Sequence, residues 1–118
     1  MPKQIRVIVI DDQIEFESIF RELLSENKKI TVEFFSDPHH AMKVIENEKG
    51  SIDFIFTDGE LGDCSGTDVL RVVKKHRPQV PVFLVSGALG KFTSSELELF
   101  DATIEKPFNK EQLLGLLV

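Results

Sequence analysis

The sequence has 118 residues, of which 42% are hydrophobic and 29% are charged, and it contains neither Tyr nor Trp. This length suits one domain over 1–118 with a single core, and the composition excludes a disordered or fibrous chain. Twenty acidic against fourteen basic residues give a net charge of -6. That charge repels nucleic acid phosphates and anionic lipid, so we expect neither nucleic acid nor a membrane as a partner.

Cysteine content and the first residues bear on the compartment. Cys64 is the only cysteine, so no internal disulfide can form, and neither it nor the three histidines show the spacing of a zinc site. The chain starts without the features of a signal peptide, and no apolar run approaches the roughly 18 residues that span a bilayer. We therefore expect a cytoplasmic protein.

The first part of the chain alternates between strand and helix patterns. Residues 4–10 (QIRVIVI) are β-branched and nearly all apolar toward their end, as in a strand covered on both faces. Apolar residues at helical spacing predict a helix over 14–24. A second strand is predicted over 30–35, and a second helix over 38–49 that Asp37 caps.

The middle of the chain repeats this pattern. Residues 52–57 (IDFIFT) predict a third strand, which places Asp58 at its end. A loop then leads to a third helix over 67–75, and a fourth strand is predicted over 80–85.

The last part supplies the remaining elements. A capping box that begins at Thr93 predicts a short helix ending near residue 100. A brief strand over 102–105 and a helix over 111–118 follow. Five strand-helix units in alternation indicate an α/β fold with a parallel, doubly wound sheet and helices on both faces.

Polar residues follow four of the predicted strands, where such a sheet binds its ligands: Asp11 and Asp12, Asp58, Ser86, and Lys106. If the first and third strands are neighbours, three carboxylates converge and their repulsion raises their pKa values unless a cation is present. Oxygen ligands with room for water suit Mg²⁺ better than a soft metal.

The same edge offers the groups that phosphoryl transfer requires. Lys106 can pair with an anion as a point charge, and the Ser86 hydroxyl can donate to one of its oxygens. A carboxylate nucleophile, a metal, a lysine and a hydroxyl donor together can move a phosphoryl group onto an aspartate. Asp58 is the expected acceptor because it stands alone after a buried strand.

These motifs, in this order and over essentially the whole chain, resemble the receiver domain of two-component response regulators: Asp11-Asp12, FIFTD ending in Asp58, FLVSG containing Ser86, and Lys106-Pro107-Phe108. Gly66 matches the family glycine that opens the third helix. The resemblance implies a flavodoxin-like receiver fold with strand order 2-1-3-4-5. It also implies a cis Lys106-Pro107 bond.

The resemblance also implies roles for the site residues. Asp58 accepts the phosphoryl group from the phosphohistidine of a histidine kinase or phosphotransfer protein. Asp12 and Asp58 bind Mg²⁺ directly, Asp11 binds it through water, and the backbone carbonyl of Glu60 completes the protein ligands. Ser86 and Lys106 contact the phosphoryl group. Such a domain assists its own phosphorylation and dephosphorylation without being an enzyme, and it signals by conformational change to a downstream protein effector or a covalently linked output domain.

The sequence departs from the family pattern in the loop after Asp58 and in the fifth strand. Gly62 stands where many receivers carry Pro, and Thr103 replaces an aromatic residue whose rotation couples to the serine. The Glu60 side chain is expected to overlook the phosphoryl site. No output domain lies within the 118 residues, which favours a free-standing signalling protein or a receiver excised from a longer one.

Two other functions remain open. Asp58 and Glu60 are spaced like the nucleophile and acid of a haloacid-dehalogenase-type phosphatase, although in that class the nucleophile lies near the start of the chain. Thr103 and Gly62 also fit a receiver-like interaction module that phosphorylation does not switch.

Overall fold

The structure, a computed structural model, describes residues 4–117, and strands alternate with helices along them. The strands are β1 (Ile5–Ile10), β2 (Ile30–Phe35), β3 (Phe54–Thr57), β4 (Val82–Ser86) and β5 (Ala102–Glu105). The helices are α1 (Glu15–Ser25), α2 (Pro38–Asn47), α3 (Gly66–His76), α4 (Ser94–Glu98) and α5 (Lys110–Leu116), with a 3₁₀ turn η1 (Leu89–Lys91) before α4. The predicted alternation is confirmed with small differences at the ends, and Val118 of the predicted last helix lies outside the described residues.

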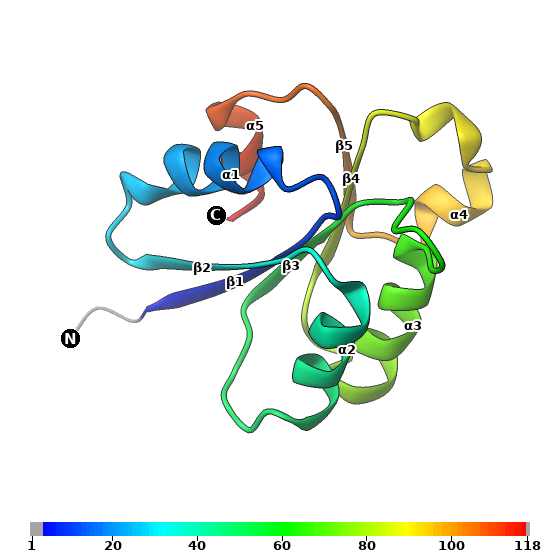
Figure 1. Cartoon of the computed structure of the whole chain (residues 1–118), viewed down its shortest axis with the longest axis horizontal. Coiled ribbons are helices and arrows are strands. Elements are labelled where there is room, and N and C mark those ends of the chain that lie inside the picture. The colour runs from blue at the N-terminus through cyan, green and yellow to red at the C-terminus, as the bar shows by residue number, and fades with distance from the viewer. Residues whose placement is uncertain (1–3, 118) are drawn as a thin grey trace.

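Within residues 4–117 the strands form one parallel five-stranded sheet in the order β2-β1-β3-β4-β5, which confirms the predicted topology (Figure 1). β1 pairs with both β2 and β3, and Ile10 lies opposite Phe35 on one side and Thr57 on the other. The strand order reverses here, so the carboxyl ends of β1 and β3 form the switch point where a doubly wound sheet binds its ligands.

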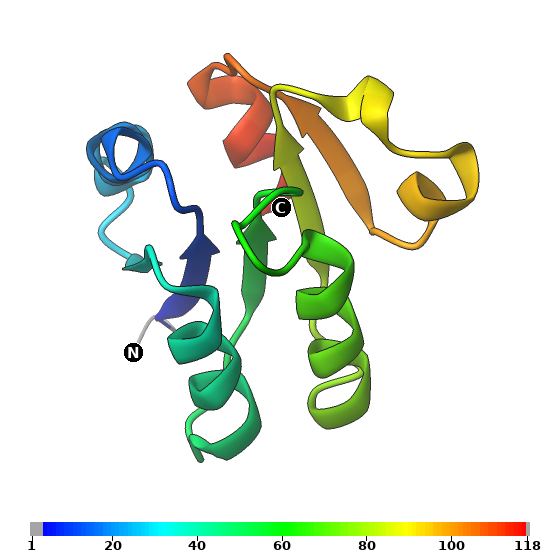
Figure 2. The same ribbon diagram turned by 45° about the vertical axis from the view of Figure 1, so that its right-hand side comes forward.

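Helices cover both faces of the sheet, because successive side chains of each buried strand point to opposite faces (Figure 1, Figure 2). Val7 and Val9 of β1 pack with residues of α1 and α5, including Phe20 and Leu113. Ile8 and Ile10 of β1 pack with residues of α2 and α3, and these two helices lie side by side in both views. The continuous apolar run of β1 therefore fills two cores.

Helix α2 ends at Asn47, two residues before the predicted end at Lys49. The Arg77 guanidinium, just after α3, donates hydrogen bonds to the carbonyl oxygens of Ile45, Glu48 and Gly50. Helix C-termini leave carbonyl groups without partners in the helix, and a cation suits them. Arg77 therefore supplies hydrogen bonds to the end of α2 and to the chain that leaves it.

The segment between β4 and β5 is more irregular than the predicted single helix. The capping box of Thr93 and Glu96 is present, but α4 stops at Glu98 and Phe100 turns into the core. The Asp101 carboxylate then accepts a hydrogen bond from the Val82 N–H at 2.8 Å, which fixes the start of β4 against β5. Among the described helices, none has the length and apolar character needed to cross a membrane.

Candidate phosphoryl-acceptor site

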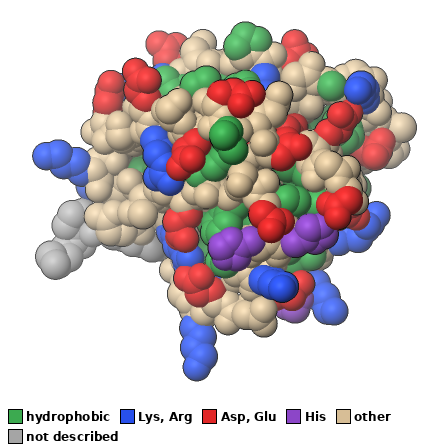
Figure 3. All heavy atoms as spheres, viewed as in Figure 1, with side chains coloured by type: hydrophobic (Ala, Val, Ile, Leu, Met, Phe, Trp, Pro, Cys, Tyr) green, Lys and Arg blue, Asp and Glu red, His purple; other side chains and the backbone are tan. Residues whose placement is uncertain are grey.

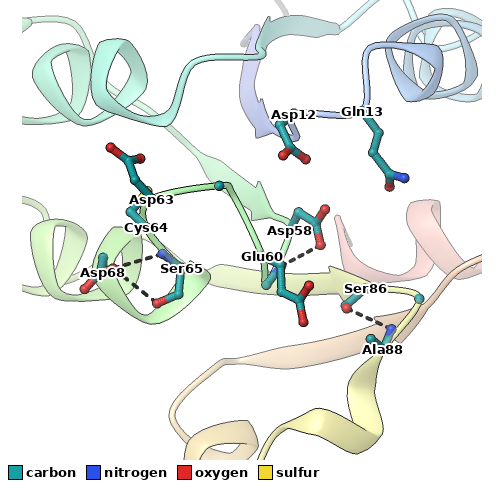
Figure 4. Close-up of a pocket in the computed structure, with 13 residues that line it drawn as sticks. Asp12, Gln13, Asp58, Glu60, Asp63, Cys64, Ser65, Asp68, Ser86 and Ala88 are labelled. Atoms are coloured by element: carbon teal, nitrogen blue, oxygen red, sulfur yellow. Dashed lines mark hydrogen bonds between the residues drawn. The ribbon is translucent and has the colours of Figure 1, made fainter.

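The loops that follow β1, β3 and β4 surround an open pocket of about 790 Å³ at the carboxyl edge of the sheet (Figure 4). Asp12, Asp58 and Ser86 line it, each from a different strand end. In the close-up the carboxylates of Asp12 and Asp58 face one another across the pocket. The edge that the sequence predicts as the binding site is therefore a pocket in the structure.

The predicted aspartates converge at the switch point. Carboxylate oxygens of Asp11, Asp12 and Asp58 all lie within 4.8 Å of one another. Asp11 and Asp58 are 2% and 7% exposed, whereas Asp12 is exposed. The Asp58 N–H donates to the Ile10 carbonyl oxygen at 2.8 Å, so the ends of β1 and β3 are tied together at this point.

Lys106 extends from the end of β5 into this cluster. Its Nζ lies 2.7 Å from Asp11 Oδ2, 2.9 Å from Gln13 Oε1 and 3.4 Å from Asp58 Oδ2. The ammonium also lies 4.1 Å from the centroid of the Phe16 ring, a cation–π contact. The Lys106-Pro107 peptide bond is cis, as predicted.

Burial raises the pKa of Asp11 from 3.8 to about 6. The hydrogen bond from Lys106 and the Gln13 backbone N–H lower it, and the neighbouring charge of Asp58 raises it again. The desolvation cost exceeds the stabilisation by Lys106 because Asp11 is almost wholly removed from water. A further positive charge at the cluster would therefore be favourable.

The loop after Asp58 binds the carboxylate of this predicted acceptor. Asp58 Oδ1 accepts a hydrogen bond from the Gly59 N–H at 2.7 Å. Gly66, the first residue of α3, lies so close to this loop that an added Cβ would be 2.8 Å from the Asp58 carbonyl oxygen. The predicted glycine at the start of the third helix thus has a steric reason.

The remaining predicted residues lie around the same pocket. Ser86 is 2% exposed, and its Oγ accepts a hydrogen bond from the Ala88 N–H at 3.0 Å, which leaves the hydroxyl hydrogen free to donate to an anion. The exposed Glu60 side chain lines the pocket, and its carboxylate pairs with Lys91 Nζ at 3.2 Å. Sequence reasoning missed this ion pair.

A sequence profile of the response regulator receiver domain matches residues 7–117. The chain belongs to this family. NtrX-like response regulators of Rickettsia typhi and Rickettsia bellii are 30% and 27% identical to it over 97% and 96% of its length. The chain spans about a quarter of these relatives, 24% in each case.

Solved receiver structures share the fold. A CheY-like response regulator receiver domain protein from Methanospirillum hungatei JF-1 has a TM-score of 0.80 at 28% identity, over 97% of this chain and 90% of its own. The response regulator TrrA of Thermotoga maritima, solved in complex with Mg²⁺–BeF, has a TM-score of 0.81 over 98% of this chain and 100% of its own. Its identity of 20% shows the fold alone.

This receiver of the two-component type lacks an aromatic side chain at position 103. Thr103 is exposed on β5 and lies opposite Leu84 of β4 in the sheet register. Phe92 instead packs near the acceptor loop, because its ring occupies the space where a Cβ on Gly59 would be. An aromatic contact to the loop after Asp58 therefore comes from the β4–β5 connection.

Proposed function

We propose that this receiver accepts a phosphoryl group on Asp58 in a Mg²⁺-dependent reaction, with the phosphohistidine of a histidine kinase or phosphotransfer protein as the donor. The observation that carries the proposal is the convergence of Asp11, Asp12 and Asp58 at the switch point with the Lys106 ammonium among them. Such a site combines a nucleophile with positive charge for the transferred group.

The donor atoms of the cluster fit Mg²⁺. Three carboxylates within 4.8 Å supply only oxygen, and the raised pKa of the buried Asp11 indicates that Lys106 alone does not compensate the buried charge. Asp12 and Asp58 would bind the ion directly, Asp11 would bind it through water, and the Glu60 carbonyl would complete the set. When bound, the ion supplies positive charge that neutralises the phosphoryl oxygens. The Mg²⁺–BeF complex of TrrA supports this assignment.

Each protein group then has a defined part in the transfer. A carboxylate oxygen of Asp58, held by the Gly59 N–H, forms a bond to phosphorus as the bond from phosphorus to the donor nitrogen breaks. Lys106 pairs with the transferred group, and the Ser86 hydroxyl donates to one of its oxygens. Phosphorylation changes the conformation of the surface around the site, and a protein effector or a covalently linked output domain responds to that change. The domain assists its own phosphorylation and dephosphorylation without turning over a separate substrate.

The test is incubation with acetyl phosphate and Mg²⁺, followed by intact mass measurement. We expect one added phosphoryl group on the parent and none on Asp58→Asn, because the amide is a poor nucleophile. Asp101→Asn is the matched control, since its amide oxygen can still accept from the Val82 N–H and it lies outside the pocket. Labelling of the Asp58→Asn variant equal to that of the parent would refute the assignment.

The same incubation distinguishes the two other functions. A receiver-like interaction module gives no mass increase in the parent. A dehalogenase-type phosphatase releases inorganic phosphate over many turnovers from a generic phosphatase substrate. The receiver proposal accounts for Lys106, Ser86 and the aspartates, which all converge on the pocket. No feature of the pocket favours either of the two other functions over it.

A further inference from the structure

A second group of possible metal ligands lies beside the acceptor pocket. His39, at the start of α2, directs its Nε2 to the Asp63 carboxylate, 3.0 Å from each oxygen. Ligand atoms of His39, Asp63 and Cys64 all lie within 4.8 Å of one another. His39 and Asp63 are exposed, and Cys64 is half-buried (Figure 3 shows histidine side chains on this face of the molecule).

We propose that His39, Asp63 and Cys64 form a binding site for a transition metal of the zinc class, separate from the Mg²⁺ site. Imidazole nitrogen, thiolate sulfur and carboxylate oxygen are the three ligand types that proteins offer to Zn²⁺. The all-oxygen cluster at Asp11, Asp12 and Asp58 suits a hard ion instead. Three protein ligands leave a fourth tetrahedral position for water.

The backbone around these residues positions the three ligands. Asp37 caps α2 by accepting from the His39 N–H at 2.9 Å, which fixes the residue that carries the imidazole. The Leu61 N–H donates to the Cys64 carbonyl oxygen at 3.0 Å, and Glu60 pairs with Ser65 in an antiparallel bridge. Asp63 and Cys64 therefore lie in a hydrogen-bonded turn.

The local charge favours a cation at the sulfur. Burial raises the pKa of the Cys64 thiol, and the charges of Asp63, Asp68 and Asp37 raise it further. These carboxylates oppose a bare thiolate but attract a dication, which itself removes the thiol proton on binding. His39, which pairs with Asp63, is the basic side chain among the three.

A metal at this site would link α2 to the loop that follows the acceptor. Asp63 and Cys64 line the same pocket as Asp58, and in Figure 4 they lie on the side away from Ser86. Gly62, with φ 78°, gives the loop a conformation that other residues rarely adopt. The metal would therefore restrain the connection between Asp58 and α3.

Cobalt is the probe that separates this site from the Mg²⁺ site. Reduced, metal-free protein is titrated with Co²⁺, and the near-ultraviolet sulfur-to-cobalt charge-transfer band is recorded. Cys64 is the only cysteine, so this band reports its sulfur alone. We expect the band in the parent, its loss on addition of Zn²⁺, and its persistence in Asp12→Ala and in excess Mg²⁺.

Matched variants then test the other two ligands. His39→Ala and Asp63→Asn should each weaken the apparent Co²⁺ affinity by at least about tenfold, the loss expected when a metal site is disrupted. His76→Ala is the control, because it removes an exposed imidazole at the far end of α3. Absence of the band in the parent, or equal affinities in the His39→Ala and His76→Ala proteins, would overturn the proposal.

Discussion

Lys106 lies among the carboxylates of the proposed phosphoryl site. Its Nζ contacts Asp11, Gln13 and Asp58, and the side chain is only 7% exposed. A buried carboxylate without a counter-ion is strongly destabilising, so Lys106 stabilises the metal-free cluster in addition to its proposed contact with a phosphoryl group. The uncompensated part of the burial cost appears in the raised pKa of Asp11.

That pKa leads to a prediction about pH. Because the folded-state pKa of Asp11 is about 6 against 3.8 for the ordinary group, the folded protein retains a proton that the unfolded chain has lost between these values. The free energy of unfolding therefore falls as pH rises through this window, by about 3 kcal/mol at most. Urea denaturation in EDTA should show metal-free parent losing more stability than Asp11→Asn between about pH 4 and pH 7. Parallel pH profiles for the two proteins would contradict the buried position of this charge.

Asp12 differs from Asp11 because it is exposed, whereas Asp11 is buried. Asp12→Ala should lower Mg²⁺ affinity by at least about tenfold, since it removes a proposed direct ligand. The metal-free protein should be as stable as the parent or more so, because one of three clustered charges is gone. Calorimetric Mg²⁺ titration and a urea midpoint measure the two effects. Parent-like affinity would require another set of ligands.

At the residue scale the sequence predicts which residues form the site but not all of their partners. Asp58, Ser86 and Lys106 are recognisable because each lies at the end of a strand. Gln13 and Phe16 carry no such signal, because their contacts with Lys106 depend on how α1 begins. His39 and Asp63 are 24 residues apart, so sequence spacing does not indicate that they meet.

At the scale of elements, the junction between β3 and α3 is the most tightly packed part of the site. A Cβ on Gly66 would lie 2.8 Å from the Asp58 carbonyl oxygen and 3.3 Å from Gly59 Cα. Both are backbone atoms, so the acceptor loop itself must shift. Gly66→Ala should therefore lower stability by about 1–3 kcal/mol and slow phosphorylation by acetyl phosphate.

Gly115→Ala is the matched control for this substitution. Gly115 lies within α5, and a Cβ there would meet nothing within 4 Å. Because Gly weakens a helix, the change should raise stability by at most about 1 kcal/mol and leave phosphorylation unchanged. Urea denaturation and intact mass measure both proteins. If the two substitutions had effects of the same sign on stability, the packing argument at Gly66 would fail.

The elements themselves were predictable because local signals agree with the fold. Apolar runs, the Asp37 cap and the Thr93 capping box each appear where expected. The ends of the elements were harder to predict. At the end of α2, Arg77 binds the Ile45 carbonyl oxygen from 32 residues away. Hydrogen bonds supplied by a residue so distant in sequence leave no trace in the local sequence.

At the scale of the whole molecule, the site connects both hydrophobic cores. β1 and β3 carry the carboxylates, and β1 contributes Val7 and Val9 to one core and Ile8 and Ile10 to the other. On β5, Thr103 stands where the resemblance to receivers leads us to expect an aromatic residue. The contact of Phe92 with Gly59 offers a connection between the acceptor loop and the β4–β5 segment.

The position of the site in the centre of the sheet also predicts how Mg²⁺ affects unfolding. An ion that binds only the folded state raises the free energy of unfolding by about 2.7 kcal/mol at a free concentration of about 100 times its Kd. For a domain of this size that is a rise of roughly 10 °C in Tm. Since β1 takes part in both cores, we expect Mg²⁺ to raise the Tm of a single unfolding transition of the whole domain, and not only to stabilise one loop. Scanning calorimetry of the parent across a Mg²⁺ series measures this, with Asp12→Ala as the control that should show a smaller shift at each concentration because it binds the ion more weakly. A second, unshifted transition in the parent would show that the site is uncoupled from one of the cores.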